Sequence, residues 1–358
     1  MILLGLIVLV GVIIILIFLI TSAEENKYRH EPILSEPNRE IKIGPLEYPI
    51  QNKSTLTYRH LGYLGNSGNQ LFEIAATLAI AYQNKCRVVF PSSLRTLPIY
   101  KMFDLSHLPI QDLEHDARIF EFDNYEEINI PNDGRIYNLE GYRQSYLYFE
   151  PIKEYLRNLF PLKIIPPKEN NYIAIHIRRT DFIKTPFLQK FLKLQLNCSF
   201  DYYRSALLRI REENQLPENT PVIIATDDPK WVKSHLQEID PQARLNNAKT
   251  IDEDFSLMYY APYLVITNST FSLWAAFLNE HKQIIAPSYW WHPDGVNSLM
   301  NNIHRQPICR PSWNFNDPLT GEIVKQSYHW GPEYWSNPSW FNRTVRAIFA
   351  TNTFRKRT

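Results

Sequence analysis

The sequence lacks an excess of charge of either sign. Lysine and arginine total 38, aspartate and glutamate total 37, and the net charge is +1. Proteins that bind nucleic acid through bulk charge neutralise phosphates with many clustered lysines and arginines, so this balance excludes that class. We therefore expect no nucleic acid among the partners, and any site for an anion must be local.

Cysteine is also scarce. The three cysteines, Cys86, Cys198 and Cys309, allow one disulfide and one remaining thiol. This number excludes a scaffold built on disulfides, and their spacing fits no metal site. Internal repeats and low-complexity tracts are absent as well, so the chain is expected to fold into ordinary globular domains. A length of 358 residues suits two domains, each with its own hydrophobic core.

The chain begins with a long apolar segment. Residues 2–20 carry no charge, which is enough to span a bilayer as a helix. We predict a transmembrane anchor over residues 1–22 and, because the next segment is polar and contains four prolines, a stem over residues 23–55. A signal peptide cleaved near Ala23 is the alternative.

The orientation of this anchor rests on two signals that disagree. Lysine and arginine follow the apolar segment but do not precede it, which does not favour a luminal protein. N-x-Ser/Thr triplets favour the lumen, and we predict glycosylation at Asn52, Asn197 and Asn342.

Strands and helices alternate from about residue 165. Expected strands are residues 172–177, 221–226, 264–267 and 283–286, and expected helices are residues 201–213, 229–239, 254–260 and 271–280. Asp201 is expected to cap the first of these helices. Such alternation predicts an α/β fold with a parallel sheet covered on both faces, in which ligands bind beyond the carboxyl ends of the strands.

The N-terminal half carries one comparable stretch. Gly62, Gly65 and Gly68 punctuate a loop that leads into an apolar helix over residues 71–82 and a strand over residues 87–90. A glycine loop before a helix can bring backbone N–H groups to a phosphate, although here the loop has neither the G-x-G-x-x-G pattern nor a P-loop lysine. A tight turn before a packed helix is the alternative.

Polar clusters follow three of the expected strands: HIRRTD at residues 176–181, TDDP at 226–229 and TNST at 267–270. Together they predict one crevice for a nucleotide diphosphate, with arginine matching phosphate oxygens and a helix start favouring an anion. Asp227 and Asp228 either accept from a ribose or base or cap the helix after them. Arg179, more than Arg178, is expected to pair with Asp181.

Six segments in order resemble the α-1,2-fucosyltransferases of glycosyltransferase family 11. They are GNQLFEIA (68–75), GYRQSYLYF (141–149), HIRRTD, IIATDDPKW (223–231), DFSLMYYAPYLVITNSTFSLWAAFLN (254–279) and IIAPSYW (284–290). Thr180 stands where many members have glycine, and Asn66 and Ser67 stand where arginine and leucine are usual. The α-1,6- and protein O-fucosyltransferases share HIRRTD and ATDD, so the resemblance supports the donor more than the linkage.

The resemblance implies a GT-B fold of two Rossmann-like domains with parallel sheets facing a cleft. It divides the chain into an N-terminal, acceptor-side domain at 56–165, a donor-binding domain at 166–310 and an extension at 311–358 that packs on the body. It also implies a GDP-fucose donor, a glycan acceptor such as galactose, inversion without a metal or other cofactor, and a type II Golgi membrane protein with a luminal catalytic domain.

Site residues follow from the same resemblance and from the strand-end chemistry. Donor-binding residues are expected to be Gly68, Asn69, Gln70, His176, Arg178, Arg179, Asp227, Asp228, Asp254, Asn268, Ser269 and Thr270, with His176 and Asp254 at the guanine end. Arg178 is expected to stabilise the leaving GDP. Asp181 is either the base for the acceptor hydroxyl or a partner of Arg179, unless the transition state needs no base.

Two rival interpretations remain. Asp252, Glu253 and Asp254 would be the metal site of a different sugar transferase, or else they cap a helix. The chain would alternatively be an inactive relative that binds sugar nucleotides or glycans. Tryptophans in the tail, at 313, 330, 335 and 340, would stack on sugars or pack on the body.

Overall fold

The computed structural model describes residues 40–63, 65–113, 118–121, 125, 127–164, 166–180, 197–290 and 308–325. Within these ranges no helix combines the length and apolarity that crossing a membrane requires. The predicted anchor over residues 1–22 lies outside the described residues.

The N-terminal unit is built on a four-stranded parallel sheet in the order β4-β3-β6-β5. Its strands are β3 (Asn52–Thr57), β4 (Cys86–Val89), β5 (Arg118–Glu121) and β6 (Ile136–Glu140). Helix α2 (Ser67–Asn84) connects β3 to β4 and packs beside both, and most of its residues are buried, as its apolar sequence predicts. Shorter helices are η1 (Ser92–Thr96), α3 (Pro98–Met102), η2 (Tyr146–Tyr148), η3 (Glu150–Tyr155) and α4 (Leu156–Leu159).

The C-terminal unit contains a seven-stranded sheet in the order β13-β12-β11-β10-β7-β8-β9. Its strands are β7 (Ile173–Ile177), β8 (Val222–Thr226), β9 (Ala243–Leu245), β10 (Tyr263–Val265), β11 (Gln283–Pro287), β12 (Asn314–Asn316) and β13 (Ile323–Val324). All neighbours pair in parallel except β12 and β13. Its helices are α7 (Phe200–Glu213), α8 (Pro229–Ile239), α9 (Ile251–Tyr260) and α10 (Thr270–Leu278). The predicted α/β fold with parallel sheets is confirmed.

Two predicted boundaries are wrong. Residues 40–55, assigned to a stem, form the hairpin of β1 (Glu40–Ile43) and β2 (Leu46–Pro49) and most of β3, the strand between β4 and β6. Ile43, Leu46 and Tyr48 are buried in the core, so the prolines in this stretch end short strands rather than extend a linker. Residues 314–316, assigned to an extension, form β12, which pairs with β11 inside the sheet.

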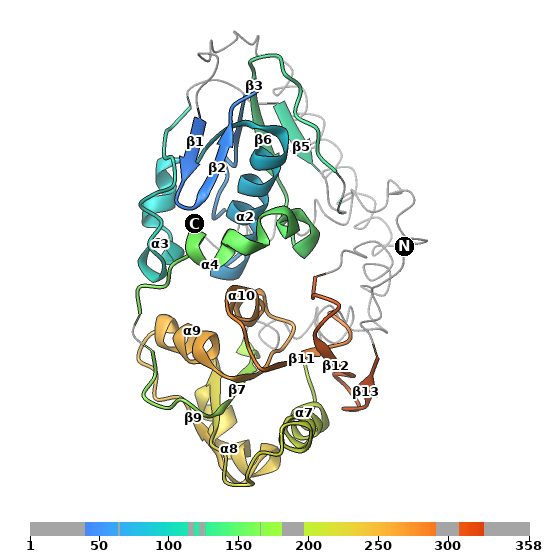
Figure 1. Cartoon of the computed structure of the whole chain (residues 1–358). Helices are drawn as coiled ribbons and strands as arrows, with labels where there is room; N and C mark the ends of the chain where they lie inside the picture. Colours follow the sequence, from blue (N-terminus) through green and yellow to red (C-terminus); the bar gives the residue numbers. More distant parts are fainter. Residues whose placement is uncertain are drawn as a thin grey trace, which may run out of the picture.

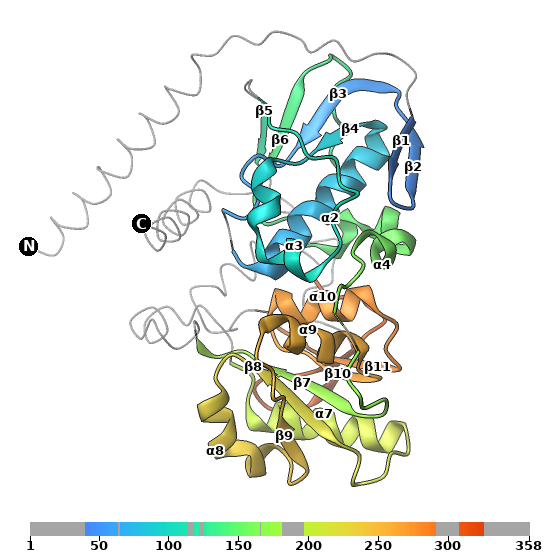
Figure 2. The same cartoon turned by 90° about the vertical axis from the view of Figure 1, so that its left-hand side faces the viewer.

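Helices lie between the two sheets. Figures 1 and 2 show α2 and α4 of the upper unit resting on α10 of the lower unit. Trp274 of α10 lies 5.1 Å from both Phe72 of α2 and Phe149, measured between ring centroids, and Phe160 and Phe277 complete the aromatic cluster. One continuous core therefore joins the units at this point, and the predicted cleft is filled by aromatic side chains here.

Smaller predictions are settled by local contacts. Ser199, not Asp201, caps α7, because its hydroxyl accepts from the N–H of Tyr202 at 3.1 Å. All three cysteines are free thiols. Trp313 packs with its ring centroid 5.0 Å from that of Phe277, as the packing alternative predicts, and tryptophans 330, 335 and 340 lie outside the described residues.

Candidate functional site

The carboxyl edges of the two parallel sheets face each other. Nine residues separate the carboxyl end of β3 from the start of α2, and four separate the carboxyl end of β10 from the start of α10. The two helix starts touch at Gly68, where an added Cβ would lie 2.5 Å from Oγ1 of Thr270 and closer still to the carbonyl carbon of that residue. Gly68 is therefore required for the close approach of two helices, and both positive helix ends converge on one place.

These two helix starts share a second property. The N-cap residues Asn66 of α2 and Ser269 of α10 make no side-chain capping hydrogen bond. By contrast, side chains cap α7, α8 and α9. The first N–H groups of a helix have no partner within the helix and need one from elsewhere. The two uncapped starts are thus suited to an anion such as a phosphate.

His176 brings the end of β7 to the same place. Its side chain is buried, and its ring centroid lies 6.0 Å from that of Phe271 in the first turn of α10. Burial, with a further contribution from the charge of Arg178, lowers the pKa of His176 to about 3. The imidazole is therefore neutral at physiological pH, and its Nδ1 has no hydrogen-bond partner among the described residues.

Asp227 organises the loop that carries the arginines. It accepts from the backbone N–H groups of Arg179 at 2.8 Å and Thr180 at 3.0 Å, and from the Thr180 hydroxyl. It also forms an ion pair with Nε of Arg178 at 3.3 Å. Burial alone would raise the pKa of Asp227, but the Thr180 hydroxyl and Arg178 together lower it below its usual value. In this structure the carboxylate oxygens of Asp227 bind residues 178–180, and these contacts fix Arg178 at the end of β7.

The neighbouring pair has a structural role. Asp228 caps α8 by accepting from the N–H of Trp231 at 3.2 Å, as the capping alternative predicts. It also pairs with Nε of Arg179 at 3.5 Å, and the Arg179 guanidinium carbon lies 3.5 Å from the centre of the Trp231 ring. Arg179 is thus held against α8. Asp181, its expected partner and the candidate base, lies outside the described residues.

Asp252, Glu253 and Asp254 stand at the start of α9, where the alternative to a metal site is that they cap the helix. The structure agrees with this alternative in part. Thr250 caps the helix, and Glu253 reaches back to the N–H of Lys249. Asp254 accepts a hydrogen bond at 2.9 Å from the side-chain nitrogen of Asn246, the residue that follows β9. Burial raises the pKa of Asp254 to about 6 despite that hydrogen bond. No group of three metal-ligating side chains occurs among the residues that are described.

Five of the predicted donor residues thus lie along one edge of the C-terminal sheet. Thr270 follows β10, His176 and Arg178 end β7, Asp227 follows β8, and Asp254 lies beside the residue after β9. Neighbouring strands lie about 4.8 Å apart, so the three intervals from β10 to β9 make a row of about 14 Å. A row of this length suits an extended ligand rather than a small anion.

Three further predicted residues shape the surroundings of the helix starts. Asn268 is buried and engaged at both ends, because its oxygen accepts from the Thr267 hydroxyl at 3.0 Å and its nitrogen donates to the Trp290 carbonyl at 3.3 Å. Asn69 accepts from Gln144 at 2.8 Å. Gln70 is buried, and its Oε1 has no partner among the described residues.

Several residues of this site escaped the sequence prediction. Trp231 contacts Arg179 across 52 positions and Gln144 reaches Asn69 across 75, whereas Asn246 contacts Asp254 only eight positions later. Thr180, Trp231 and Gln144 stood inside segments that carry the family resemblance, but only the hydroxyl of Thr180 was a local signal that could have been used.

One predicted glycosylation site is wrong. Asn52 lies in β3 and is 7% exposed, and its side-chain nitrogen donates to the Ile130 carbonyl at 2.7 Å. A glycan on that nitrogen has no room in the folded protein. Glycosylation at Asn197 stays a prediction, and Asn342 lies outside the described residues.

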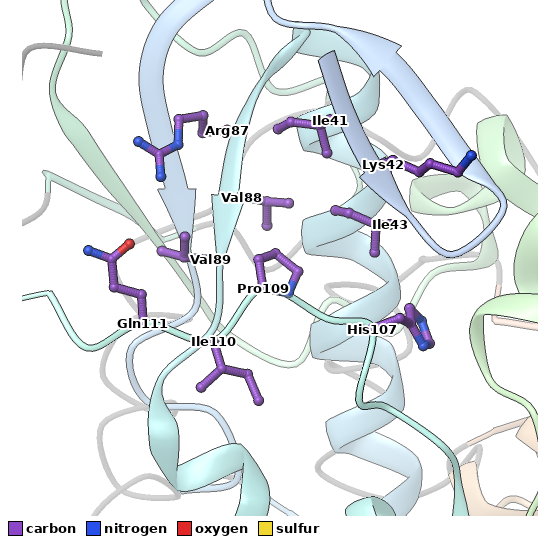
Figure 3. Close-up of a pocket in the computed structure, with 10 residues that line it drawn as sticks. All are labelled: Ile41, Lys42, Ile43, Arg87, Val88, Val89, His107, Pro109, Ile110 and Gln111. Carbon is purple, nitrogen blue, oxygen red and sulfur yellow. The ribbon is translucent and has the colours of Figure 1, made fainter. Parts of the chain in front are cut away.

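A separate cavity of about 330 Å³ lies on the N-terminal unit (Figure 3). Residues of β1, β4 and the segment 107–111 line it. None of the predicted donor residues belongs to this lining.

Comparisons with known proteins agree on one family. The profile described as "Glycosyl transferase family 11" matches residues 68–316. An α-1,2-colitosyltransferase of Escherichia coli is 30% identical over 51% of this chain and 66% of its own length. A galactoside 2-α-L-fucosyltransferase of Bos taurus is 24% identical over 67% of this chain and 72% of its own. The chain thus spans just under two thirds of the length of the bacterial relative.

Among solved structures, NodZ α-1,6-fucosyltransferase soaked with GDP-fucose aligns with a TM-score of 0.38 and 13% identity. The alignment covers 64% of this chain and 93% of that one.

Proposed function

Because the chain belongs to glycosyl transferase family 11, we propose that it transfers L-fucose from GDP-fucose to a glycan hydroxyl, forming an α-1,2 linkage to galactose. The transfer inverts the anomeric carbon, and the two units act as the two halves of a GT-B enzyme. The names of the bovine relative and of the α-1,2-colitosyltransferase support the linkage.

The observation that carries this proposal is the meeting of two uncapped helix starts and, at the end of the strand next to β10, an arginine anchored by Asp227. When the bond from fucose to GDP breaks, negative charge grows on the β-phosphate. Fixed donors aimed at that charge stabilise the transition state more than the ground state. Arg178 supplies a guanidinium for it, and the starts of α2 and α10 supply backbone N–H groups and positive dipoles.

The far end of the row suits the nucleoside. Asp254, with a pKa of about 6, is largely ionised at pH 7 and accepts hydrogen bonds. A guanine offers N–H donors that match a carboxylate. His176, which the family resemblance also assigns to the guanine, lies two strands away from β9, beside the first turn of α10, so we leave it out of this end. Asp227 and Asp228 act indirectly, by holding Arg178 and Arg179.

We propose that the reaction needs neither a metal nor another cofactor, because Arg178 and the two helix ends supply positive charge where the diphosphate leaves. We further propose a type II Golgi protein anchored by residues 2–20, with the described part in the lumen. This location rests on the apolar segment and on the resemblance to the family.

Two other functions remain as candidates. Transfer of a sugar other than fucose is favoured by the relative named a colitosyltransferase. An inactive relative that only binds the donor is the other candidate, and the substitutions at Asn66, Ser67 and Thr180 favour it.

The test is transfer of labelled fucose from GDP-fucose to acceptors that end in β-galactose, by the full-length protein in EDTA, with the product linkage read by NMR. We expect an α-1,2 product, and Arg178→Ala should lower its rate on the order of 10²- to 10³-fold. Absence of transfer to every acceptor would contradict the proposal, and activity that returns only with Mn²⁺ would contradict its metal-independent step. Donor binding without turnover would identify the inactive relative.

A further inference from the structure

A second polar cluster lies at the carboxyl edge of the N-terminal sheet. His60 follows β3, Glu140 ends the neighbouring strand β6, and Nδ1 of His60 lies 2.9 Å from Oε1 of Glu140. The His60 side chain is 50% exposed and that of Glu140 is 22% exposed. An exposed pair of this kind contributes little to stability, so its fixed geometry calls for another explanation.

Glu140 is held by the strands beneath it. The side-chain nitrogen of Asn138 donates to the same oxygen of Glu140 at 3.0 Å, while the Asn138 oxygen accepts from the N–H of Arg59 at 2.7 Å. An ionised carboxylate only accepts hydrogen bonds, so it keeps the proton of a neutral His60 on Nδ1. The lone pair is then on Nε2, which is the arrangement of a general base oriented by a carboxylate.

The pair stands on a segment that leads to the donor site. The Tyr58 hydroxyl donates to the Gly141 carbonyl, His60 meets Glu140, and Gln144 donates to Asn69 at 2.8 Å. Residues 58–69, which include the start of α2, are thus joined to residues 140–144 at three points. The last point adjoins Gly68, whose helix start touches α10.

The surface around the pair also suits a sugar. Tyr63 is 51% exposed and its ring lies 5.4 Å from that of His60, and Tyr142 is 37% exposed. Exposed tyrosines combine an apolar face with a polar end, which are the two features that a pyranose needs from its site.

We infer that His60 is the general base that removes the proton from the acceptor hydroxyl, that Glu140 positions it, and that the acceptor sugar binds beside Tyr63 and Tyr142. This inference rests on the proposed function. The acceptor oxygen bonds to the anomeric carbon while its proton passes to Nε2 of His60. The bond from that carbon to the β-phosphate oxygen breaks, and the electron pair leaves with GDP. The imidazolium next to Glu140 then releases its proton to water.

The first test uses the full-length protein with His60→Ala. We expect kcat for transfer to fall on the order of 10²- to 10⁴-fold, the usual contribution of a general base. The Kd for GDP-fucose should stay within twofold, because His60 belongs to the acceptor side. Added imidazole should restore part of the rate of this variant and leave that of the wild type unchanged. His107→Ala, in the same unit beside the cavity of Figure 3, is the matched control and should transfer at close to the wild-type rate.

The second test is Glu140→Gln, which keeps the shape of the side chain. Its kcat should fall at least tenfold while KM for the acceptor changes little, and Glu140→Asp should recover part of the loss. If the wild type transfers fucose and both His60→Ala and Glu140→Gln keep its kcat, the inference is overturned and the proposed function stands. Absence of transfer by the wild type would overturn the proposed function, and the inference would fall with it.

Discussion

Replacing Gly68 by alanine should separate the two helix starts that form the proposed phosphate site. The new Cβ would lie 2.5 Å from Oγ1 of Thr270, whereas ordinary contacts between heavy atoms begin near 3.5 Å, so α2 and α10 must part by about 1 Å. Such overpacking costs about 1–3 kcal/mol of the free energy of unfolding, of which the better helix propensity of alanine offsets at most about 1 kcal/mol.

The functional loss should exceed this loss of stability. A displacement of about 1 Å in a positioned site can reduce activity on the order of 10²-fold, and we expect GDP-fucose binding and transfer both to fall by at least tenfold. Calorimetric titration of GDP-fucose measures the binding, and urea unfolding measures the stability of the same sample.

The matched control is Gly321→Ala. There an added Cβ would lie 2.7 Å from the carbonyl carbon of Asp201, and the residue has a φ of +78°. This variant should lose stability at least as much as Gly68→Ala but keep its affinity for GDP-fucose. A folded Gly68→Ala protein that binds the donor as the wild type does would refute the assignment of the helix starts to the diphosphate.

Four further substitutions test other parts of the protein. Asp227→Asn should weaken GDP-fucose binding tenfold or more in calorimetry, because Arg178 loses its anchor, whereas Asp228→Asn should change the free energy of unfolding by less than about 1 kcal/mol, because asparagine caps helices as well as aspartate does. For His176, the pKa of about 3 in the folded protein lies below the unfolded value of 6.5, so the unfolded chain takes up the proton first and stability falls as pH falls. When the pH is lowered from 7.5 to 5.0, the free energy of unfolding of the wild type should fall by about 2 kcal/mol more than that of His176→Gln. Urea unfolding at both pH values measures this difference. Burial raises the pKa of Glu73 well above its usual value, so its contribution is present below about pH 4.5 and is lost as pH rises; Glu73→Gln should therefore be at least as stable as the wild type at pH 8 in the same assay.

Much of the C-terminal unit could be predicted because local sequence patterns indicate its helices and strands. Residues 229–239 form α8 as predicted, since a proline at the first helical position follows an aspartate that caps it. The buried strands β7 and β8 are continuous apolar runs, which is typical of parallel strands covered on both faces. Their common carboxyl edge then follows from the alternation with helices, whereas the order of the strands is known only from their pairing in the structure.

The errors come from segments whose structure depends on distant partners. β1 and β2 are four residues each, and only their packing against the N-terminal core distinguishes them from a proline-containing stem. β12 has three residues and becomes a strand by pairing with β11.

The site itself shows the same division. Residue types and strand-end positions pointed to His176 and Arg178, because charge at the end of a buried strand is conspicuous, whereas Asp254 came from the family resemblance. The contact of Gly68 with Thr270 joins residues 202 positions apart, and nothing local to either residue encodes it. The pairing of Asp227 with the 178–180 loop likewise appears only when β7 and β8 lie side by side.

The most direct test of the central claim is calorimetric titration of nucleotide sugars into the full-length protein in EDTA, with the wild type compared with Arg178→Ala. We predict tight binding of GDP-fucose by the wild type, much weaker binding of GDP-mannose and UDP-galactose, and a loss of GDP-fucose affinity of at least tenfold in the variant. Equal affinity of the wild type and the variant, or binding by the wild type only after Mn²⁺ is added, would contradict a donor site built on Arg178 and two helix starts.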